Sequence, residues 1–220
     1  MNRLRKEIKE GKFHQLYLLY GPEDYLRNQY KNLLRDALLP PDSPGAGMNL
    51  HYFREKEATQ GALIDLAETM PFFGERRLII LEDTDLFKGG QEELTDYLAS
   101  PAPTACFMFV EKNVDRRTKL YKVLNAKGLT AEFKTPDEGT LIRWCIKLAA
   151  DRGLSFGEGA LELLFDYAGR DMNRLKNELE KLAAFCLDRE RIEASDIREL
   201  CVKNPEDTIF KMMDSIAEKD

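Results

Sequence analysis

The sequence predicts an α/β fold: a parallel five-stranded sheet with helices on both faces, followed by a small all-helical domain. Three observations support this prediction. Five short β-rich stretches alternate with helical patterns over residues 1–136, and such alternation is typical of a parallel sheet. Helical patterns then follow one another over residues 137–203 without a convincing strand. A chain of 220 residues is also long enough for two modest cores.

The five expected strands share an apolar composition rich in β-branched and aromatic residues. They are QLYLLYG near residue 16, NLHYFRE near 49, RRLIILED near 76, ACFMFVEK near 105 and LTAEFKT near 129. The run from Leu78 to Leu81 has no polar alternation, which is typical of a strand buried on both faces. Between the strands, EDYLRNQYKNLLRDALL, ATQGALIDLAETM and EELTDYLAS carry apolar residues at helical spacing.

The second part of the chain, residues 137–203, is expected to be a small helical bundle. Gly153 and Gly169 are well placed to end helices, and Trp144 is expected to anchor the bundle core. Residues 204–220 contain PEDTIFKMMDSIAEKD, whose apolar stripe has no later segment to cover it. We therefore expect a first helix of a further, truncated domain there.

Composition excludes several classes of function. The net charge of −6 argues against indiscriminate nucleic-acid binding. Two histidines and four widely spaced cysteines leave no zinc pattern and little material for a histidine-based triad, so we expect buried free thiols, no bound metal and no cofactor. The N-terminal segment lacks the apolar core of a secretion signal, and no apolar run approaches the roughly 20 residues of a membrane helix. The cytoplasm is the expected location.

The stretch LYLLYGPEDYLRNQY near the N-terminus has the frame of a phosphate-binding loop, because an apolar strand meets a glycine turn and a helix. The pattern G-x-x-x-x-G-K-[ST] is absent after Gly21, and Glu23 and Asp24 would compete with an anion for the positive end of the helix dipole. Glu82 and Asp83 follow the third strand, where a Walker-B acid would hold magnesium. Acids are also common at this position for purely structural reasons. The sequence therefore predicts a degenerate nucleotide site at Gly21, Glu82 and Asp83, with an active ATPase as the alternative.

A second candidate site precedes the third strand, in TMPFFGER. Pro71 is expected to end a helix and Gly74 to allow a tight turn, so that Phe72 and Phe73 project from a loop. Adjacent aromatic side chains, with Met70 beside them, can bury a large apolar area in a partner's pocket. The alternative is that at least one ring folds back to cap the core.

Taken together, these motifs resemble the delta subunit family of the bacterial DNA polymerase III clamp loader. The matching segments are YLLYGPEDYL, ETMPFFGERRLIILED, KNVDRRTKLYKVL, GRDMNRLKNELEKL and EDTIFKMMDSI. The resemblance implies an AAA+-like module with a RecA-type α/β domain, a helical lid and a C-terminal collar domain. It also implies a subunit of the DNA polymerase III holoenzyme, a DNA-directed DNA polymerase and nucleotidyltransferase, that does not hydrolyse ATP itself.

The implied partners are the beta sliding clamp, the gamma/tau and delta prime subunits of the loader, and primed DNA, with no membrane. In the family the clamp-binding residues lie at the helix-to-strand junction that Met70, Pro71, Phe72 and Phe73 occupy here. A sequence-specific DNA-binding protein is a third possibility, which the acidic balance and the lack of a recognition helix disfavour.

Two basic groups acquire a second interpretation from the resemblance. Lys112, Arg116, Arg117 and Lys119 follow the fourth strand, a region that in AAA+ relatives lies near an intersubunit face. They could contact a neighbouring subunit or DNA phosphates, or they could simply be a solvated helix start. Arg170 and Arg174 occupy the place of a phosphate-sensing arginine in an active lid. We expect them to be structural and to pair with Glu178 or Asp171.

Overall fold

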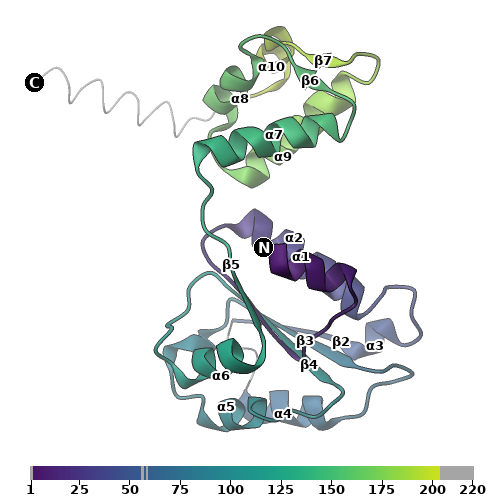
Figure 1. Cartoon of the computed structure of the whole chain (residues 1–220), viewed down its shortest axis with the longest axis vertical. Coiled ribbons are helices and arrows are strands. Elements are labelled where there is room, and N and C mark those ends of the chain that lie inside the picture. Colours follow the sequence, from purple (N-terminus) through teal and green to yellow (C-terminus); the bar gives the residue numbers. More distant parts are fainter. Residues whose placement is uncertain (1, 56, 58, 204–220) are drawn as a thin grey trace, which may run out of the picture. The chain divides into compact units, whose positions relative to one another are not determined.

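The computed structural model describes residues 2–55, 57 and 59–203. The chain divides into two compact units, the first ending at Thr135 and the second beginning at Pro136 (Figure 1). The predicted first helix of a further domain, in residues 204–220, lies outside the described residues.

The first unit is built on a five-stranded sheet in the order β2-β3-β4-β1-β5, in which every pairing is parallel. The strands are β1 (Leu16–Tyr20), β2 (Leu50–Arg54), β3 (Arg77–Glu82), β4 (Ala105–Glu111) and β5 (Leu129–Glu132). All five predicted strands and their parallel arrangement are therefore confirmed. The middle strand is β4, which is buried along its whole length, and β3 lies beside it with the predicted apolar run fully buried.

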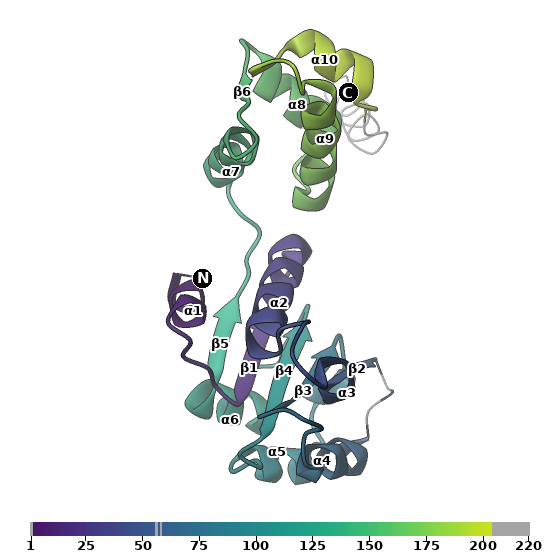
Figure 2. The same cartoon turned by 90° about the vertical axis from the view of Figure 1, so that its right-hand side faces the viewer.

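Helices cover both faces of this sheet, as predicted (Figures 1 and 2). One face carries α1 (Asn2–Lys9), α2 (Asp24–Leu38) and α3 (Ala46–Asn49), and the other carries α4 (Gln60–Glu68), α5 (Glu92–Leu98) and α6 (Lys119–Lys127), with a 3-10 turn at Asp85–Lys88. Successive strand residues point to opposite faces, so β1 contributes Tyr17 and Leu19 to the first layer and Leu16 and Leu18 to the second. Helix α1 was not predicted from the sequence. Among the described helices, none combines the length and the apolar composition of a membrane span.

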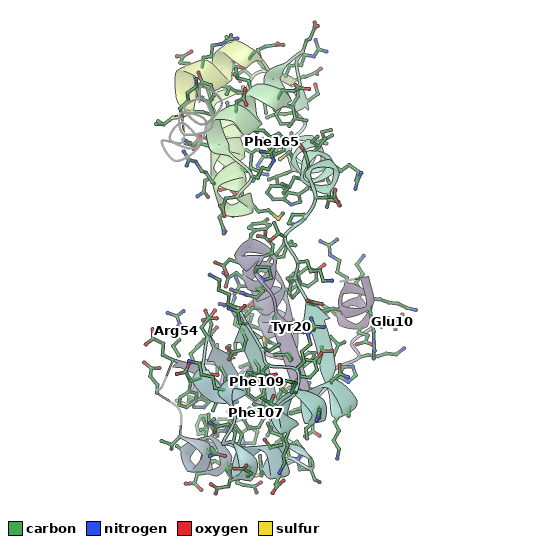
Figure 3. All side chains as sticks on the ribbon, turned by 90° about the vertical axis from the view of Figure 1, so that its left-hand side faces the viewer. Glu10, Tyr20, Arg54, Phe107, Phe109 and Phe165 are labelled. Atoms are coloured by element: carbon green, nitrogen blue, oxygen red, sulfur yellow. The ribbon has the colours of Figure 1, made fainter. Side chains whose placement is uncertain are left out.

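The layer beneath α4, α5 and α6 is filled by aromatic side chains from the middle strand. Phe107 and Phe109 stack with ring centroids 6.2 Å apart, and Figure 3 shows them inside the first unit. Phe87 and Tyr97 meet these two rings edge to face. This layer fixes the positions of β3 and β4, whose two ends carry the candidate sites.

The second unit contains α7 (Glu138–Ala150), α8 (Ala160–Ala168), α9 (Met172–Phe185) and α10 (Ala194–Leu200). It is not purely helical, because β6 (Ser155–Phe156) and β7 (Arg191–Ile192) form a short parallel pair. Strands of two residues are too short to leave a periodic pattern, so β6 and β7 could not be predicted from the sequence. Trp144 is also only half-buried, and the fully buried positions of α7 include Leu141 and Cys145 instead.

The cysteines behave as predicted: all four are free and buried. Burial raises the pKa of the Cys106, Cys145 and Cys201 thiols to about 12. A thiol that stays protonated is neither a nucleophile nor a metal ligand, so these residues belong to the core.

Candidate functional sites at the two edges of the sheet

The carboxyl edge of the sheet brings the predicted nucleotide-site residues together. Parallel register aligns Tyr20 with Glu111 and Glu82 with Val110. Gly21 directly follows β1 and Asp83 directly follows β3, so both lie at this edge.

The backbone N–H groups of the turn at Gly21 point toward carbonyl groups of the protein. Its N–H donates to the carbonyl of Glu111 at 3.1 Å, and the N–H of Glu23 donates to the carbonyl of Phe133 at 3.1 Å. The φ angle of Gly21 is 125°, and a Cβ there would lie 2.3 Å from the Phe133 carbonyl oxygen. Glycine is therefore required for close packing against β5, and these two N–H groups are committed to protein carbonyls, whereas a phosphate loop aims such groups at an anion.

The start of α2 is likewise occupied by side chains of the chain itself. Glu23 is the N-cap residue, and its carboxylate accepts from the N–H of Tyr25 at 3.2 Å. Arg27 is 4% exposed, and its guanidinium donates to the Gly21 carbonyl and to Asp24. A carboxylate cap and an internal cation thus take the positions that a phosphate and its counter-charge would use.

The two acids after β3 also have partners within the protein. The Lys31 ammonium donates to Glu82, and Arg54 lies 3.2 Å from the other carboxylate oxygen. Burial alone would raise the pKa of Glu82, but the two cations hold this pKa below its ordinary value. Asp83 has a φ of 48° and accepts from the N–H of Lys112 at 3.0 Å. Both carboxylates therefore fix the edge of the sheet.

Glu111 is a residue of this edge that sequence reasoning missed. It ends β4, is 2% exposed, and accepts from the N–H and hydroxyl of Thr84 at 3.0 and 2.6 Å. Burial raises its pKa to about 8, although the Thr84 hydrogen bonds and the Arg27 charge favour the carboxylate. In the sequence Glu111 stands as one acid after an apolar strand, so only its packing reveals the altered acidity.

A pocket of about 860 Å³ lies beside Glu111, between the segments that follow β3 and β4. Its lining mixes charges of both signs, including Asp83, Asp115, Lys112 and Arg117. Within the part of the chain that the structure describes, there is no group of three or more side chains suited to hold a metal ion.

The predicted basic group extends from the end of β4 to the first residue of α6, and all four residues are exposed. Arg116 pairs with Glu132 at 2.6 Å and lies over the Tyr20 ring at 5.3 Å. Arg117 pairs with Asp115 at 2.8 Å. Lys112 and Lys119 complete a solvated surface whose two arginines are already paired.

The lid arginines have partners other than those predicted. Arg170 pairs with Glu138 at 3.0 Å, because it precedes α9 and does not lie on the surface of that helix. The guanidinium of Arg174 donates to the carbonyl of Val202 at 3.3 Å. Glu178 is buried and pairs with Lys181 at 2.6 Å. The expected side-chain pairs were wrong, because helical spacing says nothing about neighbours from other elements. The backbone N–H of Arg174 does donate to the Asp171 carboxylate, at 2.8 Å.

The amino edge of the sheet carries the aromatic loop, between the end of α4 and the start of β3. Met70 is 75%, Phe72 48% and Phe73 78% exposed. The two rings meet edge to face with centroids 4.5 Å apart and an interplanar angle of 81°. The alternative that one ring caps the core was therefore wrong.

The details of this loop differ from the sequence prediction. Helix α4 ends at Glu68, before Pro71 is reached. The left-handed conformation falls on Phe73, with a φ of 49°, and not on Gly74. Gly74 is needed for another reason, because a Cβ there would lie 2.8 Å from the side-chain nitrogen of Asn49.

Two buried side chains that the sequence analysis missed hold the loop backbone. Asn49 exchanges two hydrogen bonds with the backbone of Phe72, and Arg77 donates to the carbonyls of Thr69 and Met70. An asparagine before one strand and an arginine at the start of another form no sequence motif. Their function is visible only because the fold places β2 beside β3.

The parallel sheet with helices on both faces, followed by a helical unit, defines an AAA+-like fold. A family model described as "DNA polymerase III, delta subunit" matches residues 17–134. The chain belongs to this DNA polymerase III delta subunit family.

Individual relatives agree with this assignment. The chain is 29% identical to the DNA polymerase III subunit delta of Bacillus subtilis over 97% of its own length, and spans 64% of that relative. A solved structure of the Bacillus subtilis DNA clamp loader delta protein matches 99% of the chain and 67% of that structure, with 28% identity and a TM-score of 0.69. A solved structure of the Thermotoga maritima RuvB Holliday junction branch migration motor matches 90% of the chain, over 64% of the RuvB chain, with 14% identity and a TM-score of 0.54. This last likeness concerns the fold alone.

Proposed function

We propose that this chain is a noncatalytic subunit of the DNA polymerase III clamp loader that binds the beta sliding clamp and opens its ring. The observation that carries the proposal is the exposed pair Phe72 and Phe73, presented on a loop whose backbone is held by buried side chains. Met70 and Pro71 flank the pair and belong to the same contact. Family membership supplies the partner, and the loop supplies the surface that would meet it.

Clamp opening requires differential binding. A subunit that bound the closed and the opened clamp equally well would not change the equilibrium between them. The aromatic pair must therefore fit a pocket that is more accessible, or better shaped, in the opened ring. Apolar contact suits this task, because two rings in a desolvated pocket can supply a large part of the binding energy of an interface.

The rival function is an active ATPase with a degenerate site at Gly21, Glu82 and Asp83. The contacts of the carboxyl edge count against it, since Arg27 and Glu23 fill the turn and Lys31 pairs with Glu82. We propose that the AAA+-like frame is retained for packing against the other loader subunits, gamma/tau and delta prime. The exposed residues Lys112, Arg116, Arg117 and Lys119 would then face a neighbouring subunit or primed DNA in the assembled loader.

The decisive experiment is titration of the chain with the beta clamp of the same organism. Replacing both Phe72 and Phe73 with alanine should weaken binding by at least about ten-fold, which corresponds to roughly 1.4 kcal/mol. Leu187→Ala is the matched control, because Leu187 is as exposed as Phe73 but lies in the other unit. Wild-type affinity in the double variant would show that the clamp-binding site lies elsewhere.

A second measurement separates the proposed function from the rival. Equilibrium binding of ATP to the purified chain, at millimolar magnesium, should give no saturable signal and no turnover. Saturable binding with turnover, both of them lost in Asp83→Asn, would establish the ATPase alternative instead.

A further inference from the structure

We propose that Asn49 is a positioning residue for clamp binding: its buried side-chain amide fixes the backbone that presents Phe72 and Phe73. This inference rests on the proposed function of the aromatic pair and states what holds that pair in a binding-competent geometry. The side chain of Asn49 contacts the loop through the backbone atoms of Phe72.

The contact has the form of a small β-bridge made by a side chain. Asn49 is fully buried. Its Oδ1 accepts from the Phe72 N–H at 2.7 Å, and its Nδ2 donates to the Phe72 carbonyl at 2.8 Å. Both polar backbone atoms of Phe72 are thus satisfied from within the protein, and the ring of the same residue remains about half exposed. Buried hydrogen bonds of this kind are costly to break, because the freed groups stay out of water.

Two glycines provide the space for this contact. A Cβ at Gly45 would lie 2.0 Å from the Phe72 carbonyl oxygen, at a φ of 73° that itself favours glycine. A Cβ at Gly74 would lie 2.8 Å from Nδ2 of Asn49. The amide of Asn49 therefore fits a slot with glycine on both sides.

Arg77 holds the preceding part of the loop in the same way. This residue is 6% exposed, and its Nε and Nη2 donate to the carbonyls of Thr69 and Met70 at 3.2 and 2.9 Å. Its Nη1 lies 2.6 Å from Nε2 of His51 on the neighbouring strand. The loop backbone is thus anchored on both sides of Pro71 by buried groups, while the side chains of Met70 and Phe73 face solvent.

Asn49 is assigned a positioning role because it is buried and bonds the loop backbone, whereas the aromatic rings of the loop are exposed. A loop needed only to connect α4 to β3 could satisfy its exposed backbone groups with water. Here buried polar groups are used to fix it, and fixing a binding loop before the partner arrives removes the ordering entropy that binding would otherwise cost. Loss of Asn49 should therefore weaken clamp binding even though both rings are still present.

The test is a double-mutant cycle read by clamp affinity and by urea unfolding. Asn49→Ala should lower affinity about ten-fold in the wild-type background, and by less than about two-fold when Phe72 and Phe73 are already alanine. Thr95→Ala is the matched control, because Thr95 is also a buried polar residue of the first unit but lies in α5, on the other face of the sheet. It should lower stability without changing clamp affinity.

A second pair of variants covers the case in which Asn49→Ala does not fold. Gly74→Ala presses on the Asn49 amide from the loop side and should lower affinity several-fold, whereas Gly47→Ala, whose Cβ would meet no atom within 4 Å, should not. Equal affinities for these two variants would overturn the proposal, and so would an Asn49→Ala effect that persists undiminished without the rings. If the double phenylalanine variant itself binds normally, the proposed aromatic site fails together with its positioning residue.

Discussion

Phe73 combines an exposed ring with a backbone conformation that favours glycine, so substitutions there can separate clamp binding from folding stability. Its φ is 49° and its side chain is 78% exposed. The left-handed region costs a residue with a Cβ about 1–2 kcal/mol relative to the usual conformations. The ring therefore stands on a strained residue, and the edge-to-face contact with Phe72 offsets part of the strain.

The magnitudes follow from the exposed area. A phenylalanine can bury about 200 Å², so 78% exposure leaves about 150 Å² available to a partner. At about 25 cal/mol per Å² this is worth at most about 4 kcal/mol, and burial of half the area would give about 2 kcal/mol, or a roughly thirty-fold change in affinity.

Two substitutions that both remove the ring distinguish the two effects. Phe73→Ala and Phe73→Gly should weaken clamp binding to a similar extent, roughly ten- to a hundred-fold. In urea unfolding, however, the glycine variant should be the more stable of the two by about 1 kcal/mol, because alanine keeps the Cβ that the left-handed conformation disfavours.

Leu187 provides the control for this comparison. It is 82% exposed, and its φ is not among the positive values found in the described residues. There the order should reverse, with Leu187→Gly less stable than Leu187→Ala by about 0.5–1 kcal/mol. The reasoning fails if Phe73→Ala is as stable as Phe73→Gly, and the site assignment fails if both variants bind the clamp like the wild type.

Two further predictions concern buried charges at the carboxyl edge. The folded-state pKa of Glu111 is raised to about 8 from 4.5, so its contribution to stability is present below the lower value and lost as pH rises through the higher one. Glu111→Gln, which keeps an acceptor for Thr84, should match wild-type stability near pH 4.5 in urea unfolding and exceed it at pH 9 by at least about 1.4 kcal/mol. Equal stabilities at pH 9 would contradict the raised pKa of Glu111. Lys31→Met removes the buried cation that pairs with Glu82 and should lower the free energy of unfolding by about 3 kcal/mol. Lys88→Met, at an exposed pair, should lower it by less than about 0.5 kcal/mol. Similar losses for both variants would show that the Lys31 pair is effectively solvated.

The fold could be predicted from the sequence because its strands are unbroken apolar runs and its helices are amphipathic. The run from Leu78 to Leu81 is an example, since a strand with no polar face must be covered on both sides. What could not be predicted was short or sparsely patterned: α1 has only two apolar residues, Leu4 and Ile8, one turn apart, and β6 and β7 are two residues each.

The candidate sites were predictable only in part. Composition and turn-forming residues located the loop around Phe72 and Phe73. The absence of the phosphate-loop lysine after Gly21 pointed to the turn at that glycine. The residues that define both geometries, Asn49 and Arg27, could not be found in this way. Each is a polar side chain whose importance comes from burial against backbone atoms, and a sequence does not record burial of an individual polar residue.

The buried polar groups of the first unit suggest why one edge of the sheet would keep a binding function and the other would not. At the carboxyl edge, Arg27 donates to the Gly21 carbonyl and to Asp24, and Lys31 pairs with Glu82, so binding an anion there would require breaking the buried Lys31–Glu82 pair. At the amino edge, Asn49 and Arg77 bond the loop backbone from within the protein, and Arg77 also contacts His51, so a partner can cover the exposed rings without breaking these buried contacts. An apolar partner that covers the two rings therefore need not break a buried ion pair at the amino edge, whereas a nucleotide would have to break one at the carboxyl edge. This difference in cost favours a subunit that acts through protein contact over one that acts through nucleotide hydrolysis.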